Sequence, residues 1–194
     1  MTETKNIAIF ASGEGTNFSA LMESFKKNHL PIKVSVLVCD HSKAHVLKRA
    51  EKESVPTFVI NFSKYPNKAA AEKVILKELQ DRGVEFIILS GYMRIIGPTL
   101  LSVYPNKIIN IHPALLPSFP GRTGIDDAWN YGVKVTGVTV HWVDSGIDSG
   151  KIIAQDPVRR LPDDTRDSLE AKIHQTEHKL YPRVVKELLD KGEI

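Results

Sequence analysis

The chain has 194 residues, of which 42% are hydrophobic and 25% charged, with a formal net charge of +3. This composition is typical of a globular protein with a substantial core. The small net charge argues against nucleic acid as a partner, and no apolar run reaches the roughly 18 residues that a membrane span requires. Cys39 is the single cysteine and the N-terminus lacks a secretion-signal pattern, so we expect a cytoplasmic protein that does not bind membranes.

Short apolar runs alternate with helical patterns through residue 112. The expected strands cover residues 6–10, 33–39, 57–60, 86–90 and 108–112. The expected helices start near residue 18 and then cover 43–53, 68–82 and 100–104. This alternation predicts parallel strands with right-handed crossovers, in a doubly wound α/β sheet. Ligands of such sheets bind beyond the carboxyl ends of the strands, so the turns at 11–17, 90–97 and 112–124 should face one cleft.

The pattern changes in the second half of the chain. Residues 135–143 alternate, with Thr139 and His141 on the polar face, and residues 152–157 form a further expected strand after the loop 144–150. The short link predicts an antiparallel pair added to one side of a mostly parallel sheet. A final helix is expected over 165–191, which Pro182 should kink or divide. Without a linker or repeat, we expect residues 1–194 to form a single domain.

A glycine-rich turn follows the first expected strand. Gly13 and Gly15 allow a tight turn, and Thr16 and Asn17 suit the N-cap of the next helix. Backbone N–H groups at such a helix start favour a bound phosphate. A turn that serves packing alone would have the same sequence.

The same turn also resembles part of a dinucleotide fingerprint. The Gly-x-Gly spacing is present, and Asp40 could be the acid that contacts the ribose. However, Phe18 stands where the third glycine is required. A single phosphate is therefore the better interpretation than a dinucleotide.

The expected strand at 108–112 ends in residues suited to catalysis. Asn110 and His112 lie two positions apart and so point to the same face, and Pro113 ends the strand. An amide donor beside a group that titrates near neutrality suits a reaction in which an oxygen becomes negative. Asp148, in a glycine-rich loop, could orient and charge this histidine. The alternatives to a catalytic role are that His112 is a histidine of the core and that Asp148 only bonds its own backbone in a turn.

Two groups of histidines could be drawn as metal sites. His174 and His178 frame the pattern His-x-x-Glu-His of some zinc peptidases. A second possible set consists of Cys39, His41 and His45. The first has no evident third ligand and the second spans a strand end and a helix start, so we expect no bound metal.

Several segments together resemble the folate-dependent formyltransferases. They are Ser-Gly-Glu-Gly-Thr-Asn at 12–17, Gly-Tyr-Met-Arg-Ile at 91–95, Asn-Ile-His-Pro-Ala-Leu-Leu-Pro at 110–117, Pro-Gly at 120–121 and Asp-Ser-Gly-Ile-Asp-Ser-Gly at 144–150. Their order and spacing match from about residue 6 to residue 187. The resemblance implies a Rossmann-like formyltransferase fold and, in purine synthesis, formyl transfer from 10-formyltetrahydrofolate to the primary amine of glycinamide ribonucleotide.

The resemblance also implies roles for individual residues. The catalytic residues would be Asn110, His112 and Asp148. The residues that bind the amine substrate would be Gly15, Thr16, Asn17 and Glu177. The residues that bind the folate would be Lys68, Met93, Arg94, Ile95, Ile96 and Asn110. Lys68 stands where the family often has arginine, and its contact could be with folate or with phosphate. The loop 122–125 departs from the histidine-bearing version of some members, which leaves the role of Arg122 open.

These roles combine into one expected mechanism. The amine attacks the formyl carbon, Asn110 and protonated His112 donate hydrogen bonds to the resulting oxyanion, and Asp148 holds and charges His112. The alternatives are a formyltransferase for another amine such as an amino-sugar nucleotide, a non-catalytic folate- or phosphate-binding module, and a nicotinamide oxidoreductase. The presence of the two oxyanion donors, Asn110 and His112, together with Asp148 argues against a protein that only binds its ligands. Phe18 disfavours a nicotinamide cofactor. The partners would be small molecules, and the protein a monomer or a homodimer.

Overall fold

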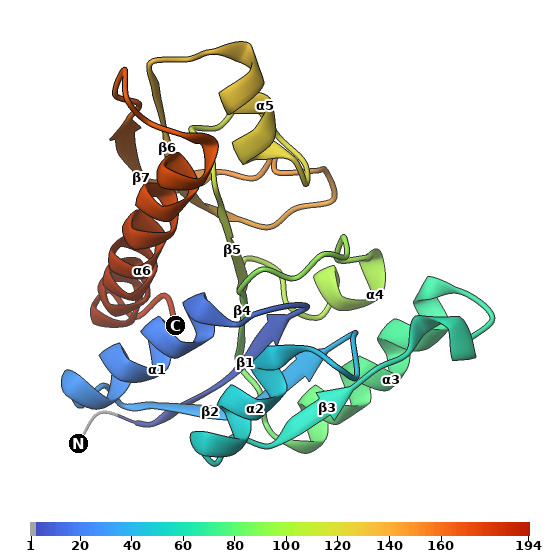
Figure 1. Cartoon of the computed structure of the whole chain (residues 1–194). Helices are drawn as coiled ribbons and strands as arrows, with labels where there is room; N and C mark the ends of the chain where they lie inside the picture. The colour runs from blue at the N-terminus through green and yellow to red at the C-terminus, as the bar shows by residue number, and fades with distance from the viewer. Residues whose placement is uncertain (1–2) are drawn as a thin grey trace.

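The computed structural model describes residues 3–194 and contains a seven-stranded sheet in the order β3-β2-β1-β4-β5-β6-β7 (Figure 1). The strands are β1 (Lys5–Ala11), β2 (Ile32–Cys39), β3 (Thr57–Val59), β4 (Phe86–Leu89), β5 (Ile108–His112), β6 (Val135–Trp142) and β7 (Ile152–Arg159). Strands β1 to β5 pair in parallel, whereas β6 runs antiparallel to both β5 and β7. The predicted fold class, a mostly parallel doubly wound sheet with an antiparallel C-terminal addition, is confirmed.

Helices cover both faces of this sheet. They are α1 (Thr16–Lys27), α2 (His45–Lys52), α3 (Lys68–Asp81), α4 (Pro98–Leu101), α5 (Gly124–Tyr131) and α6 (Arg166–Asp190), with a 3-10 turn η1 (Phe62–Lys64). Successive residues of a strand point to opposite faces, so Ile7 and Ile9 of β1 pack under α1, α2 and α6. Ala8 and Phe10 pack under α3 and α4 on the other face (Figure 1). The long apolar runs of the parallel strands are explained by burial on both sides.

Three expectations about the helices differ from the structure. The helix expected over 100–104 is α4, which begins at Pro98 and ends at Leu101. Helix α5 was not expected, because it has only eight residues, begins at Gly124 and is followed by Gly132, and these glycines suggest a loop. Its C-cap is Gly132 in the left-handed conformation, with φ of 83°. Pro182 does not divide α6, which is continuous from Arg166 to Asp190. The buried side chains on either side of Pro182 stabilise this part of the helix against the sheet.

Helix α6 is also attached to the strands that carry the site. The hydroxyl of Tyr181 is fully buried and lies 2.7 Å from the carbonyl oxygen of Leu89 and 3.2 Å from that of Ile109. Leu89 is the last residue of β4 and Ile109 is the second residue of β5, so the hydroxyl of Tyr181 ties α6 to both of these neighbouring strands. Among residues 3–194, no helix combines the length and the apolar character that crossing a membrane requires.

Candidate active site

A cleft of about 420 Å³ lies at the carboxyl edge of the sheet. It is lined by the turns that follow β1, β4 and β5, by the loop 143–148 and by one face of α6. The expectation that the three turns face one cleft is confirmed. Parallel strands end at the same edge, so residues far apart in the sequence meet there.

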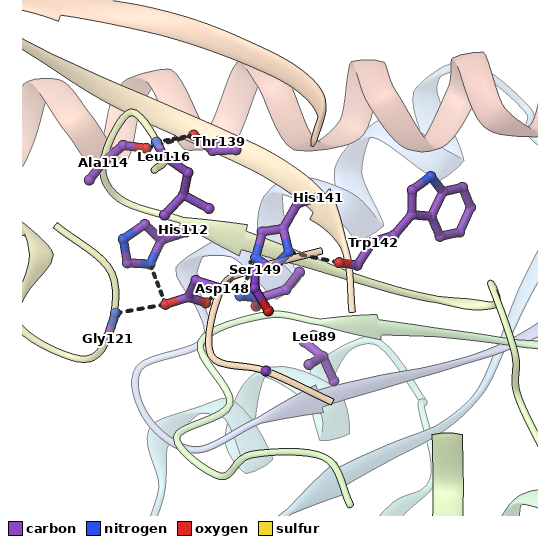
Figure 2. Close-up of polar contacts among 12 residues, drawn as sticks. Leu89, His112, Ala114, Leu116, Gly121, Thr139, His141, Trp142, Asp148 and Ser149 are labelled. Atoms are coloured by element: carbon purple, nitrogen blue, oxygen red, sulfur yellow. Dashed lines mark hydrogen bonds and ion pairs between the residues drawn. The ribbon is translucent and has the colours of Figure 1, made fainter. Parts of the chain in front are cut away.

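His112 is the last residue of β5, and its side chain is buried at the base of the cleft. Its Nε2 lies 2.7 Å from the carbonyl oxygen of Phe119, and its Nδ1 lies 3.4 Å from Oδ2 of Asp148 (Figure 2). Both partners are hydrogen-bond acceptors. Nε2 must carry a hydrogen to bond the Phe119 carbonyl, and a hydrogen on Nδ1 would point at Asp148.

Asp148 lies in the loop between β6 and β7, in a left-handed backbone conformation with φ of 49°. Its Oδ2 accepts a hydrogen bond of 2.7 Å from the backbone N–H of Gly121, and its Oδ1 lies 3.5 Å from Nε2 of His141 (Figure 2). Burial opposes ionisation of this carboxyl, but the contacts with His141, Gly121 and His112 outweigh it and lower the pKa of Asp148. Asp148 is therefore an anion between two imidazole rings at neutral pH.

His141 is a site residue to which the sequence analysis assigned no role. It lies on β6 directly opposite Asn110 of β5, and its Nε2 lies 3.3 Å from Nδ2 of Asn110. The ring Nδ1 donates to the carbonyl of Trp142 at 2.8 Å, and Nε2 faces both Nδ2 of Asn110 and Oδ1 of Asp148. The second hydrogen on Nδ2 of Asn110 remains available to an oxygen in the cleft. The alternating pattern of residues 135–143 did place His141 on the polar face, but the identity of its cross-strand neighbour depends on register.

Thr139 holds the start of the loop that follows His112. Its hydroxyl donates to the carbonyl of Ala114 at 2.7 Å and accepts the N–H of Leu116 at 3.1 Å (Figure 2). Nε2 of Gln155, on β7, lies 2.9 Å from the same hydroxyl oxygen. The antiparallel strands therefore fix where the chain leaves β5.

The predicted phosphate turn leads into α1 within the cleft. The N-cap residue is Gly15, with φ of 76°, and no side chain caps the helix. Thr16 and Asn17 lie inside α1, so the expectation that they cap it is wrong. With no side-chain cap, the first-turn N–H groups are free to bind an anion, for which a helix N-terminus is favourable.

Glu177 of α6 faces this turn. Its Oε2 accepts hydrogen bonds from Nδ2 of Asn17 at 3.2 Å and from Nδ1 of His174 at 2.7 Å. The bond with Glu177 raises the pKa of His174, against the effect of burial. The apparent zinc motif thus contains a histidine–glutamate pair beside the phosphate turn. In the described part of the chain, no three His, Cys, Asp or Glu side chains are grouped as metal ligands would be.

We call residues 91–97, which follow β4, the folate turn, after the role that the resemblance predicts for them. Met93 and Ile95 project into the cleft with half of their surface exposed, whereas Ile96 is buried. Met93 connects this turn to its surroundings, because its N–H donates to Oγ of Ser12 at 2.9 Å and its carbonyl accepts from Nη2 of Arg122 at 2.7 Å. Arg122 therefore joins the loop after β5 to the folate turn.

The structure brings all but one of the predicted site residues into the cleft. Its lining includes Gly15, Thr16, Asn17, Met93, Arg94, Ile95, Ile96, Asn110, His112, Asp148 and Glu177. Lys68 lies outside this lining, on α3, where its Nζ is 3.8 Å from Oε1 of Glu72. Lys68 therefore faces the buried side chain of Glu72.

Comparison with known proteins identifies the family. The sequence pattern of the formyl transferase family matches residues 5–185. The chain belongs to the formyl transferase family. It is 48% identical over 185 residues to the phosphoribosylglycinamide formyltransferase of Bacillus subtilis (strain 168), a match that covers 95% of each chain.

Solved structures of this family have the same fold. The crystal structure of glycinamide ribonucleotide transformylase 1 from Geobacillus kaustophilus is 52% identical, has a TM-score of 0.93 and covers 96% of this chain and 100% of its own. The chain is also 35% identical to part of the trifunctional purine biosynthetic protein adenosine-3 of Bos taurus. That match covers 91% of this chain but 17% of the bovine protein.

Proposed function

We propose that this formyl transferase moves the formyl group of 10-formyltetrahydrofolate to the primary amine of 5'-phosphoribosylglycinamide, a step of purine biosynthesis. The observation that carries the proposal is the constellation at the base of the cleft. Asn110, His112 and Asp148 lie together there, in the cleft that the phosphate turn and the folate turn also line. The similarity to enzymes named for this reaction, at 48% identity over 95% of both chains, supports the choice of substrate.

The amine substrate and the folate would enter the cleft from different sides. The phosphate would bind the N–H groups at Gly15, Thr16 and Asn17, and Glu177 would lie near the glycinamide arm. The pterin would bind backbone groups of the folate turn, against the half-exposed side chains of Met93 and Ile95. Both substrates would then meet at Asn110 and His112, because these residues line the same cleft as the two turns.

In the proposed reaction the amine attacks the formyl carbon and the formyl oxygen becomes an anion. Nδ2 of Asn110 has a hydrogen free for this oxygen, and imidazolium His112 supplies the second donor. Because Nε2 of His112 donates to the Phe119 carbonyl at 2.7 Å, the formyl oxygen must replace that carbonyl as acceptor. The proton released by the amine moves through Asp148 to the departing folate nitrogen. No acyl-enzyme forms, since the nucleophile belongs to the substrate.

A formyl-transfer assay with 10-formyltetrahydrofolate and 5'-phosphoribosylglycinamide tests this function. We expect turnover by the unaltered protein and its near-complete loss in His112→Ala. A panel of other amines, including an amino-sugar nucleotide, tests the alternative acceptor. Faster formylation of any of these amines would overturn the proposed substrate, and tight folate binding without turnover would favour a binding module.

The dephosphorylated substrate tests the phosphate turn separately. Calorimetric titration should show that 5'-phosphoribosylglycinamide binds at least tenfold more tightly than the same molecule without its phosphate, because the N–H groups of a helix start favour an anion. Equal affinities would refute the assignment of Gly15, Thr16 and Asn17.

We also propose that residues 1–194 work as a single formyltransferase domain. The continuous sheet and the family match over residues 5–185 support this proposal. A cytoplasmic location is proposed as well, since the single cysteine, Cys39, is buried and needs no oxidising compartment.

A further inference from the structure

Two buried carboxylates lie outside the lining of the cleft and take no part in the proposed reaction. Asp40 directly follows β2, and Glu72 lies in the second turn of α3. The side chain of Asp40 is 1% exposed and that of Glu72 is 3% exposed. Burying an ionised carboxylate is costly unless it is paired or hydrogen-bonded, so the partners of these groups indicate their role.

Asp40 is attached to the first part of the folate turn. Its Oδ2 lies 2.7 Å from Nε of Arg94, and the guanidinium of Arg94 stacks on Phe62, 4.1 Å from the ring centroid. The hydroxyl of Ser12 hydrogen-bonds Asp40 and also accepts the N–H of Met93 at 2.9 Å. Asp40 thus holds Arg94 directly and Met93 through Ser12.

This arrangement differs from the role that the dinucleotide-like turn suggested for Asp40, which was contact with the ribose of a dinucleotide. A ribose acid would have to reach the cleft, whereas Asp40 is directed at Arg94 and His41. Burial opposes its ionisation, but the hydrogen bonds from Ser12, His41 and Arg94 outweigh it and lower the pKa of Asp40. The carboxylate therefore keeps its charge at neutral pH.

Glu72 is attached to the last residue of the folate turn. Its Oε1 accepts the N–H of Gly97 at 2.7 Å in a buried hydrogen bond, and Nζ of Lys68 lies 3.8 Å from the same oxygen. The carboxylate also packs directly against the glycine. A Cβ at position 97 would lie 2.5 Å from Oε2 and 2.8 Å from Oε1 of Glu72, a separation too short for atoms that are not bonded to each other.

We propose that Asp40 and Glu72 are positioning residues that hold the two ends of the folate turn and so set its backbone for the pterin. Between these anchors, Ile95 contributes a half-exposed side chain to the cleft. Hydrogen bonds to backbone groups weaken steeply with small displacements, so a turn that presents backbone groups needs fixed ends. The inference rests on the proposed function, because it names what prepares the same folate site.

The first test removes the anchor at the end of the turn. Glu72→Ala should raise the KM for 10-formyltetrahydrofolate about tenfold, since the buried N–H of Gly97 loses its acceptor, and should leave the KM for 5'-phosphoribosylglycinamide within about twofold. Glu72→Gln should restore most of the affinity, because an amide oxygen can accept the same hydrogen bond. An unchanged folate KM in Glu72→Ala, or equal losses for both substrates, would overturn the role of Glu72.

A second variant approaches the same contact from the turn. Gly97→Ala pushes the Glu72 carboxylate away without removing it and should also raise the folate KM. In the Glu72→Ala background, Gly97→Ala should have less than about twofold further effect, because the shortened side chain leaves room. If Glu72→Ala folds poorly, the single variant Gly97→Ala still tests the proposal, because it must then show the folate-selective loss by itself. Additive effects of the two changes would contradict a direct contact.

The other anchor is tested by Asp40→Ala, with Asp40→Asn as the conservative variant. We expect a folate-selective rise in KM for the former and partial restoration for the latter, because an amide can still bond Ser12 or Arg94. Glu78→Gln is the matched control: Glu78 lies on α3 and its carboxylate pairs with Arg82. Its folate KM should be unchanged, and a shift equal to that of the Asp40 variant would contradict a specific role.

Direct titration with tetrahydrofolate separates this inference from the proposed function. An unaltered protein without turnover and without tetrahydrofolate binding would refute both. An active unaltered protein, together with Glu72 and Asp40 variants that bind tetrahydrofolate normally, would refute the positioning role alone.

Discussion

The parallel side of the cleft, formed by the turns after β1 and β4, offers mainly backbone groups, whereas the antiparallel side offers side chains gathered around one carboxylate. On the parallel side, Gly15 begins an uncapped helix and Met93 is held by its N–H and its carbonyl. On the antiparallel side, Asp148 lies between His112 and His141.

In the proposed function, this difference separates binding from chemistry. The parallel side would bind through groups that every residue has, so its function depends on where the backbone lies. The antiparallel side would act through ionisable groups, so its function depends on which side chains are present. Truncated side chains should therefore lower kcat on the antiparallel side, and backbone displacement should raise KM on the parallel side.

The largest effect is expected from the proposed oxyanion donors. His112→Ala and Asn110→Ala should each lower kcat on the order of 100-fold or more with little change in either KM, because each removes a donor to the developing anion. Steady-state kinetics measures this effect, and circular dichroism checks the fold. Near-normal kcat in both variants would place the chemistry elsewhere.

Asp148→Asn should lower kcat as well and also change the dependence of stability on pH. The pKa of Asp148 is below its ordinary value of 3.8 in the folded protein, so the carboxylate stabilises the fold above that value and the stabilisation is lost as pH falls through the folded pKa. Thermal melts should show a deficit for Asp148→Asn at pH 7 that shrinks toward pH 3. A deficit that does not depend on pH would argue against the charge as its cause.

A smaller loss, about tenfold in kcat, is expected for His141→Ala. This histidine contacts Asn110 and Asp148 without a required contact to the reacting atoms, so it acts by orienting them. Truncation should change kcat more than either KM. An equal rise in both KM values with unchanged kcat would assign His141 to binding instead.

On the parallel side, a matched pair of glycines isolates the effect of backbone position. A Cβ at position 15 would lie 2.5 Å from Cγ2 of Val46, and the alanine would have to keep the backbone φ of 76° that Gly15 has. Gly15→Ala should therefore displace the phosphate turn and raise the KM for 5'-phosphoribosylglycinamide several-fold. Gly13→Ala is the control, because no heavy atom lies within 4 Å of its added Cβ. Equal KM values for the two variants would contradict the predicted dependence on backbone position.

The smallest effect concerns the pair of His174 and Glu177. Because this bond raises the pKa of His174 above 6.5, its stabilising effect is complete below pH 6.5 and is lost as pH rises through the folded pKa. The histidine side chain is 44% exposed, so screening by solvent keeps the effect small. Melts of His174→Ala should show a small deficit at pH 6 that fades by pH 9, and a constant deficit would indicate packing.

Local patterns account for most of what was predicted correctly. The alternation of apolar runs and helical patterns placed β1 to β5, and Pro113 marked the end of β5 after His112. The edge at which the turns meet followed from the rule that parallel strands share one direction. Helix α5 was missed because its eight residues, which start with a glycine, carry too little periodicity to distinguish a helix from a loop.

The contacts that organise the site were not predictable in the same way. His141 lies beside Asn110 because of the antiparallel register of β5 and β6, and a polar face in a sequence does not name its neighbour. Asp40 and Glu72 were not recognised as anchors of the folate turn, since their partners lie 54 and 25 residues away. Lys68, for which a contact with folate or phosphate stays a prediction, lies outside the lining of the cleft and its ammonium group faces Glu72.

The sequence by itself determined the fold class, the edge of the sheet at which the cleft lies, and the residue types at the end of β5. These features follow from hydrophobic periodicity and turn chemistry, which act over a few neighbouring residues. The tertiary structure decided which groups contact Asn110, His112 and Asp148, and what holds the folate turn in place. Such contacts depend on strand pairing and on the packing of distant elements, because a side chain's partners are set by where the chain returns in space.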